Sequence, residues 1–315
     1  MSSPTDWSAL TTLPAKVAAY ADEIYFRETW DELSELVDRV PDLLNGAVTV
    51  LFKPDAVVGR RIATCLDFLA EHGFRPVAAR TLDFTRHMTR EIWRFQGNAA
   101  TLDRFRVIDA LMSATPCLLV VFRNGGSSSN PPATVRLRNL KGNGYRGKKQ
   151  PNGLRRVASS PLPMLSLIHS PDEPIDMIRE LGIVLDVDAR RELLTSVAAS
   201  WDGDATEVVR ALADGLHAAH PAVTLDPDAA REAVLGALRD SAEDDLTRSA
   251  QLVKALETGA DPDLTWPELV GALNDLPVPV PRWDLIMVAS MVLRMNLPGV
   301  APHIPSDGSS EWVRR

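Results

Sequence analysis

Cysteine is scarce in this chain, and long apolar runs are missing. Its 315 residues include two cysteines, Cys65 and Cys117, which lie in apolar segments and cannot supply a disulfide framework. The longest strongly apolar stretches, residues 116–122 and 285–293, fall far short of the roughly 20 residues that cross a bilayer. The N-terminal region shows no apolar block followed by a small-residue cleavage site. We therefore expect a cytoplasmic protein that spans no membrane, with both thiols in its core.

The sequence also lacks any nuclease, protease or dinucleotide-binding fingerprint, and no segment repeats at a fixed period. What it has is an ordinary globular composition, with 45% hydrophobic and 24% charged residues, 18 glycines and 23 prolines. This composition excludes a disordered, collagen-like or coiled-coil chain, and the length suits one large domain or two ordinary ones.

Charge divides the chain into two unlike parts. Residues 1–184 carry a net charge of +3, whereas residues 185–315 carry −11. The pI of about 5.3 and the acidic second part offer no extended positive face for a polynucleotide, so we expect no nucleic-acid partner. Acidic helices of this kind are usually solvated, and docking of a basic partner protein is the alternative.

A basic run stands out within the first part. Between residues 136 and 156 the chain has eight cations and no acid. The eight cations are Arg136, Arg138, Lys141, Arg146, Lys148, Lys149, Arg155 and Arg156. A run like this is most often a solvated surface or a nucleic-acid tail. Because the rest of the chain does not suit a polynucleotide, a small polyphosphate is the better-fitting ligand.

Hydrophobic periodicity predicts a mixed first part and an all-helical second part. The expected strands are residues 47–52, 75–82, 117–122 and 165–168. The expected helices of the first part are residues 16–39 (one helix or two), 60–72, 89–95, 101–113, a short one ending near 140, and 173–181. Residues 125–132 and 141–156 read as loops. The expected helices of the second part are residues 187–199, 204–219, 227–240, 243–258, 265–275 and 283–295.

His169 is the most interesting candidate for chemistry. It directly follows the last expected strand, and Glu180 follows it by eleven residues, or three helical turns. Lys53 ends the first strand in a Lys-Pro-Asp turn, and Arg156 precedes His169 by thirteen residues. Taken singly, each is more often structural or solvated; taken together with Arg138, they have the charges that phosphoryl transfer needs.

At these positions the sequence resembles the nucleoside diphosphate kinases. The segment VTVLFKPDAVVGRRIATCLDFLAEHGFRPVAARTLDF is similar to that family's opening strand, Lys-Pro-Asp turn, first helix and second strand. The runs RLRNLKG, GLRR and SLIHSPDEPIDMIREL then follow in the order of the family's arginine helix, nucleotide-loop arginine, catalytic histidine and orienting glutamate. The resemblance covers about residues 47–184.

The resemblance implies an α/β (α+β) fold, in which a ferredoxin-like antiparallel sheet has helices on one face. We expect three parts: an N-terminal helical arm (1–46), the kinase-like domain (47–184) and an acidic helical domain (185–315), which has no counterpart in the family. Family members often assemble through the sheet domain, so a homo-oligomer is one expectation, and a partner protein bound through residues 185–315 is another.

The resemblance also implies roles for single residues. His169 would be the phosphorylated nucleophile and Glu180 would fix its tautomer, while Lys53, Arg138 and Arg156 would hold the polyphosphate. Trp93 lies where the family usually has a tyrosine near the histidine. Mg²⁺ would arrive bound to ATP, because it prefers phosphate oxygens and water to many protein ligands, and Asp172 is the nearest acidic candidate.

The sequence departs from the family pattern at positions that bear on the choice of the phosphate acceptor. The family's asparagine, glycine and serine around the histidine are Ser166, Ser170 and Pro171 here, and an expected threonine is Gly144. We expect an ATP-dependent phosphotransferase whose acceptor is a nucleoside diphosphate or a specialised small molecule. The alternatives are a catalytically degenerate nucleotide-binding module whose helical domain binds a partner protein, and phosphohistidine relay to a protein.

His217 and His220, three residues apart on an expected helix, are a weak candidate for a metal site. No third ligand lies nearby in the sequence, and zinc sites need three or four.

Overall fold

The fold is built around one antiparallel sheet. The structure, a computed structural model, describes residues 7–124, 130–142, 152–240, 246–259, 261, 263–305 and 312. The strands are β1 (Ala47–Phe52), β2 (Phe74–Leu82), β3 (Cys117–Asn124) and β4 (Ile168–His169), in the order β2-β3-β1-β4. All three neighbouring pairs are antiparallel, which confirms the expected α/β ferredoxin-like class.

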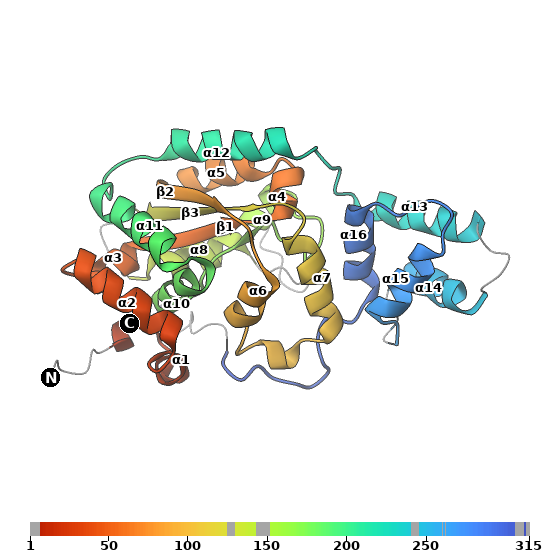
Figure 1. Cartoon of the computed structure of the whole chain (residues 1–315), viewed down its shortest axis with the longest axis horizontal. Helices are drawn as coiled ribbons and strands as arrows, with labels where there is room; N and C mark the ends of the chain where they lie inside the picture. Colours follow the sequence, from red (N-terminus) through yellow and green to blue (C-terminus); the bar gives the residue numbers. More distant parts are fainter. Residues whose placement is uncertain are drawn as a thin grey trace.

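Helices precede, connect and follow the strands (Figure 1). Those of the first part are η1 (Trp7–Ala9), α1 (Pro14–Tyr20), α2 (Ile24–Leu36), α3 (Val40–Gly46), α4 (Pro54–Val58), α5 (Ile62–Glu71), α6 (Arg86–Ile92), η2 (Gly97–Ala99), α7 (Leu102–Met112), α8 (Ala133–Lys141), α9 (Leu154–Val157) and α10 (Pro174–Val184). The second part has α11 (Val187–Ala199), α12 (Thr206–Ala219), α13 (Pro227–Asp240), α14 (Leu246–Thr258), α15 (Trp266–Asn274) and α16 (Arg282–Val292).

Helices cover both faces of the sheet, so the expectation of helices on one face is wrong. Strand β1 is buried along its whole length, and its alternate side chains enter two separate cores. Val48, Val50 and Phe52 pack with α5 and α12, whereas Leu51 packs with α2, α10 and α11. Successive strand residues point to opposite faces, so a strand that is apolar at every position needs cover on both sides.

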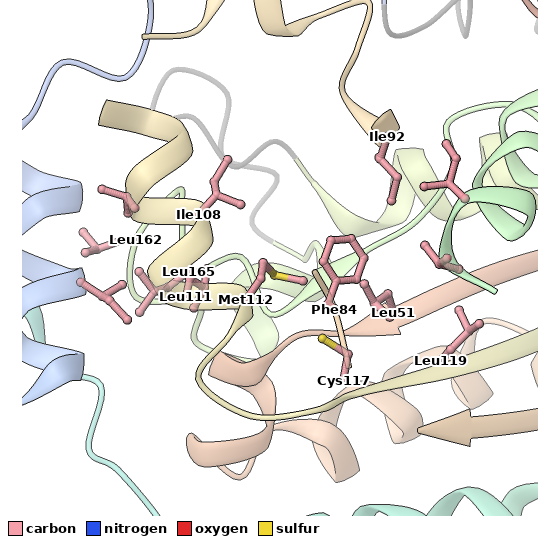
Figure 2. Close-up of a cluster of buried hydrophobic side chains, with 14 of the residues drawn as sticks. Leu51, Phe84, Ile92, Ile108, Leu111, Met112, Cys117, Leu119, Leu162 and Leu165 are labelled. Atoms are coloured by element: carbon pink, nitrogen blue, oxygen red, sulfur yellow. The ribbon is translucent and has the colours of Figure 1, made fainter. Parts of the chain in front are cut away.

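Figure 2 shows part of the core that includes Leu51, where α7 and the segment before β4 meet the sheet. Met112 of α7 lies near Cys117, which begins β3, and Leu111 lies near Leu165. Leu162 and Leu165, from the chain that leads into β4, complete this layer. Both Cys117 and Cys65 are fully buried free thiols, as the apolar runs around them predict. The packing fixes the segment that carries His169.

The expected domain boundary at residue 184 stays a prediction. The helices after it pack in two different places. Helices α11 and α12 pack against β2, and α12 contributes to the core that contains Val48, Val50 and Phe52. Helices α13–α16 gather at one end of the molecule, where α16 packs against α7 (Figure 1). After α16 the chain returns along the α6–α7 loop, where Ala100 and Asn296 form an isolated β-bridge.

Several boundaries differ from the sequence predictions for local reasons. The last strand contains only residues 168 and 169, because Leu167 has a left-handed backbone (φ 66°) that interrupts an extended segment. Helix α6 begins three residues before the expected start, because the Thr85 hydroxyl accepts a hydrogen bond from the Met88 N–H (3.3 Å) and caps it. A short helix, α9, lies in the expected 141–156 loop, of which residues 143–151 are outside the described part. Residues 125–129 of the expected 125–132 loop and residues 243–245 of the expected 243–258 helix also lie outside the described residues.

Among the described residues, no helix combines the length and apolar character that a membrane span requires.

Candidate functional site

The site begins at β4, which is held against the turn that follows β1. His169 pairs with Leu51, so the histidine lies at the sheet edge next to the end of β1. The Lys53 N–H donates to the Leu167 carbonyl (2.9 Å), and the Leu167 N–H donates to Asp55 Oδ2 (2.8 Å). The Lys-Pro-Asp turn therefore fixes the chain just before the histidine.

His169 and Glu180 form a direct hydrogen bond, the contact that the resemblance implied. Nε2 of the ring lies 2.9 Å from Oε2 of Glu180, which is carried on α10. Both side chains are partly shielded, with 19% and 15% of their surfaces exposed. Because the carboxylate accepts from the Nε2–H, the lone pair of the neutral ring is on Nδ1. We find no hydrogen bond to Nδ1 among the described residues.

Trp93 contacts the same ring. It lies at the C-terminal end of α6 and meets His169 edge to face, with ring centroids 5.2 Å apart and planes at 74°. Such an aromatic contact limits the rotation of the imidazole without using either of its nitrogens. Trp93 thus lies beside the histidine ring, and its contact to a nucleotide stays a prediction.

Two cations on α8 meet a carboxylate beside the histidine. Arg138 Nε and Lys141 Nζ each lie 3.4 Å from Oδ1 of Asp172. Lys141 Nζ also donates to the carbonyl (3.1 Å) and the hydroxyl (3.0 Å) of Ser170, the residue that follows His169. Arg138 and Lys141 are three residues apart, so they share one face of the helix. Figure 1 shows α8 beside β1.

Lys53 and Arg155 extend this cluster into the protein. Lys53 is 5% exposed, and its Nζ donates to the Met164 carbonyl (2.8 Å) and lies 3.6 Å from Asp55 Oδ1. Arg155 donates from Nη1 to the Gly142 carbonyl (2.8 Å), and its buried Nε has no partner among the described residues. Burial lowers the pKa of Lys53, Asp55 partly offsets this, and the Arg155 charge lowers that pKa further.

The same causes act on the other buried cations. Burial lowers the pKa of Lys141, Asp172 opposes the change, and the Arg155 charge adds to it. Burial also lowers the pKa of the Arg155 guanidinium, although Asp172 and Asp55 counteract it. In each of these three groups burial outweighs the neighbouring carboxylates, so the net direction is a lowered pKa.

The predicted phosphate-binding residues are placed differently by the fold. Lys53 and Arg138 belong to the cluster, whereas the side chain of Arg156 is exposed on α9. Its neighbour Arg155 is the guanidinium that reaches the cluster. Lys141 is also there, although sequence reasoning placed it only in the basic run. The sequence signal for Lys141 was its position three residues after Arg138, which places both on one face of a helix. For Arg155 and Arg156, no feature of the sequence indicates which of the two side chains points toward the cluster.

Residues of the N-terminal arm line one side of the site, which the sequence did not predict. A small cavity of about 70 Å³ lies beside His169 and is lined by residues of α1, α6 and α10. Its polar lining includes Tyr20, Asp172, Asp176 and Glu180. The Tyr20 hydroxyl donates to Asp176 Oδ1 (2.9 Å), and burial raises the pKa of Asp176 to about 6. The arm thus closes one side of the site.

The residues present do not fit a metal site of their own. Asp172, the predicted ligand, already faces two cations, and metal coordination would have to displace them. Across the described ranges, no group of three or more His, Cys, Asp or Glu side chains could hold an ion. The backbone carbonyls of His217 and His220 accept hydrogen bonds from Arg60 Nη2 (3.0 and 2.7 Å) at the end of α12. Burial and the Arg60 charge lower the pKa of His217.

Comparison with known proteins gives a distant likeness. No protein-family model matches this sequence, and no curated protein sequence matches it either. The chain is similar in structure to the nucleoside diphosphate kinase of Aquifex aeolicus, at 21% identity and a TM-score of 0.38, over 46% of this chain and 97% of that one. It is also similar to the nucleoside diphosphate kinase from Encephalitozoon cuniculi, at 17% identity and a TM-score of 0.39, over 46% and 91% of the two chains. Likenesses this distant carry no argument about activity, which must come from the geometry above.

Proposed function

We propose that this protein is a phosphotransferase that moves the terminal phosphate of a nucleoside triphosphate to an acceptor through a phosphohistidine at His169. The acceptor is a nucleoside diphosphate or a specialised small molecule. The observation that carries this proposal is the His169–Glu180 hydrogen bond, together with the contacts of Lys141 to Ser170, the residue after the histidine, and of Arg138 and Lys141 to Asp172. The motif resemblance supports the same function from the sequence.

The first half-reaction uses the ring nitrogen that Glu180 leaves available. The Nδ1 lone pair attacks the terminal phosphorus, an N–P bond forms, and the bond from that phosphorus to the bridging oxygen breaks. The nucleoside diphosphate leaves with the bonding electrons. The ring then carries a positive charge, which the Glu180 carboxylate stabilises through the Nε2–H.

The second half-reaction reverses the exchange with another molecule in the same place. An acceptor oxygen attacks the phosphorus, the N–P bond breaks, and the imidazole recovers its lone pair. Because one nucleophile serves both steps, donor and acceptor bind in turn and the kinetics are ping-pong. The protein needs mainly to position the groups and to balance charge on the transferred phosphoryl.

The cation group supplies that balance. Arg138 and Lys141 contact Asp172, and the Arg155 charge acts electrostatically on Lys53 and Lys141. The unpartnered Nε–H of Arg155 is a buried donor of the kind that a phosphate oxygen satisfies. Charge-assisted hydrogen bonds to phosphate are short and strong, so a polyphosphate gains most where cations are already desolvated.

The test is transfer of label from γ-labelled ATP to the full-length protein. We expect an acid-labile, base-stable label on the wild type and on His87→Asn, which changes an exposed histidine outside the site. The variant His169→Asn should take up none. Label that persists in His169→Asn would defeat the proposal.

Calorimetric measurement of ATP binding distinguishes the phosphotransferase from the main alternative, a nucleotide-binding module. If ATP binds to the wild type in calorimetry but no label is transferred, the chain is a nucleotide-binding module without turnover. Chasing the labelled protein with a panel of nucleoside diphosphates, and then with cell metabolites, identifies the acceptor by loss of label from the protein.

A further inference from the structure

We infer that the Ser170 hydroxyl donates a hydrogen bond to an oxygen of the phosphoryl group that His169 carries, which makes Ser170 a further catalytic residue of the transfer. This inference rests on the proposed function and deepens it by naming a group that holds the transferred phosphoryl. The motif resemblance gives Ser170 no role, because the family has a glycine at this position.

Ser170 lies directly after the reactive histidine and shares a cavity with it. It follows His169, the last residue of β4, and only 2% of its surface is exposed. Both residues line the cavity of about 70 Å³ beside the ring. That volume is several times what one water molecule requires, so the cavity admits a group as small as a phosphoryl. We therefore expect a phosphoryl on the ring to lie within reach of the serine.

The hydroxyl of Ser170 has a hydrogen to donate. Its Oγ accepts a hydrogen bond from Lys141 Nζ (3.0 Å), and an ammonium group can only donate. A serine hydroxyl also carries one hydrogen of its own, for which no described residue supplies an acceptor. Buried hydroxyl groups are almost always hydrogen-bonded, so the acceptor for this hydrogen is a molecule or group that enters the cavity.

A phosphoryl oxygen is the acceptor that the proposed reaction brings to this place. The transferred group carries negative charge on three oxygens, and stabilising that charge is the main task of the protein in phosphoryl transfer. Hydrogen bonds to charged oxygens are about twice as strong as those between neutral groups. Water occupies the position before the reaction, and the phosphoryl replaces it.

Lys141 is the positioning residue for this hydroxyl. Its ammonium donates to the carbonyl of Ser170 (3.1 Å) as well as to Oγ, so it fixes both the backbone and the side chain of the serine. Lys141 is itself 8% exposed and has a third acceptor, Asp172 Oδ1, at 3.4 Å. A donor bonded to a hydroxyl oxygen polarises the hydroxyl and strengthens the hydrogen bond that it donates.

The experiment measures rate and binding separately on full-length protein. The rate is that of labelling from saturating γ-labelled ATP with Mg²⁺, followed by rapid quench. Binding is measured by calorimetry with an ATP analogue in which an NH group replaces the β–γ bridging oxygen.

Two variants change the hydroxyl. Ser170→Ala removes it, and Lys141 keeps the Ser170 carbonyl and Asp172 as acceptors. Ser170→Cys keeps the size of the side chain but offers a much weaker donor. The matched control is Ser34→Ala, which removes an exposed hydroxyl on α2.

We expect Ser170→Ala to be labelled about 10-fold to 100-fold more slowly than the wild type, because one donor to the reacting group is lost. The rate of Ser170→Cys should lie between the two. Both variants should bind the analogue within about threefold of the wild-type affinity, because the lost interaction forms only with the transferring group. Ser34→Ala should match the wild type in both measurements. A serine with a structural role alone would not separate rate from binding in this way.

A wild-type labelling rate in Ser170→Ala would overturn the inference and leave the labelling test of His169 unaffected. Weaker binding of the analogue with an unchanged saturating rate would also overturn it, because the hydroxyl would then act on the bound substrate and not on the transfer. If Ser170→Ala does not fold, Ser170→Cys decides alone, and a wild-type rate in that variant contradicts the inference. Absence of label on the wild type would count against the proposed function itself.

Discussion

Glu173 is the residue whose replacement we expect to damage the fold most. Its carboxylate is fully buried at the start of α10 and accepts hydrogen bonds from the Thr12 N–H (2.9 Å) and from Trp312 Nε1 (2.8 Å). Its other oxygen lies 2.9 Å from Lys16 Nζ. Burial tends to raise the pKa of Glu173, but Lys16 and the Thr12 N–H outweigh it and hold that pKa below the ordinary value. One ionised group therefore ties both chain ends to the helix that carries Glu180.

The substitution Glu173→Gln keeps the size of the side chain and removes its charge. Its amide must point an NH₂ group either toward the Lys16 ammonium or toward Thr12 and Trp312, all of which are donors. Breaking a buried ion pair by removing one partner costs about 3–5 kcal/mol. Since Lys16 keeps a second carboxylate, Asp176, at 2.6 Å, we expect a loss near the lower end, about 3 kcal/mol of unfolding free energy.

The assay is urea unfolding followed by far-ultraviolet circular dichroism. The control is Glu232→Gln, an exposed carboxylate on α13 whose loss should change stability by less than about 0.5 kcal/mol. Because the folded-state pKa of Glu173 is lowered, its contribution is present above the ordinary value of 4.5 and is lost as the pH falls through the folded-state pKa. The gap between wild type and variant should therefore shrink in acid. A neutral-pH loss below about 1 kcal/mol, or a gap that acid leaves unchanged, would refute this reasoning.

Three further predictions concern the site. Glu180→Gln should slow labelling of His169 by about 100-fold while leaving ATP affinity nearly unchanged, as measured by a rapid-quench time course; equal rates would exclude an orienting role. Arg155→Met should weaken ATP binding about tenfold or more, and Arg156→Met less than about twofold, in calorimetry; the reverse order would place the exposed arginine in the site. Because burial lowers the pKa of Lys53 and Lys141 and a bound polyphosphate raises it, binding should take up protons, and affinity should fall as the pH rises toward the ordinary lysine value of 10.5. Calorimetry in buffers of different ionisation enthalpy measures this uptake, and a heat independent of the buffer would contradict it.

Local signals in the sequence were enough to locate many of the elements. Residues 47–52 were expected as a strand and 187–199 and 227–240 as helices, and the structure has β1, α11 and α13 with those bounds. Each segment carries its own hydrophobic period and its own start and stop residues, so no distant contact is needed to define it. His169 and Glu180 are also close in the chain: β4 ends at His169, and α10, which begins at Pro174, carries Glu180 back to within 2.9 Å of the ring.

The extent of the last strand and the cover of the sheet depended on distant contacts. Asp55 accepts from the N–H of Leu167 and helps hold it in a left-handed backbone, 112 residues away along the chain. Helices α11 and α12 follow the expected domain boundary and nevertheless pack on β2. A fully apolar strand indicates that both faces are buried, but periodicity does not say which helices bury them.

Amino-acid order by itself determined most of the elements, the spacing of His169 and Glu180 and the concentration of positive charge, because each arises from residues close together in the chain. Tertiary structure alone decided that Arg155 rather than Arg156 turns inward, since adjacent side chains on a helix point in different directions and only the packing of α9 chooses between them. It also decided that Lys16 and Tyr20 wall the site, because they meet α10 across about 160 residues through hydrogen bonds and an ion pair. Such buried polar contacts have no local pattern, since each partner looks like an ordinary surface residue until the fold removes water from both.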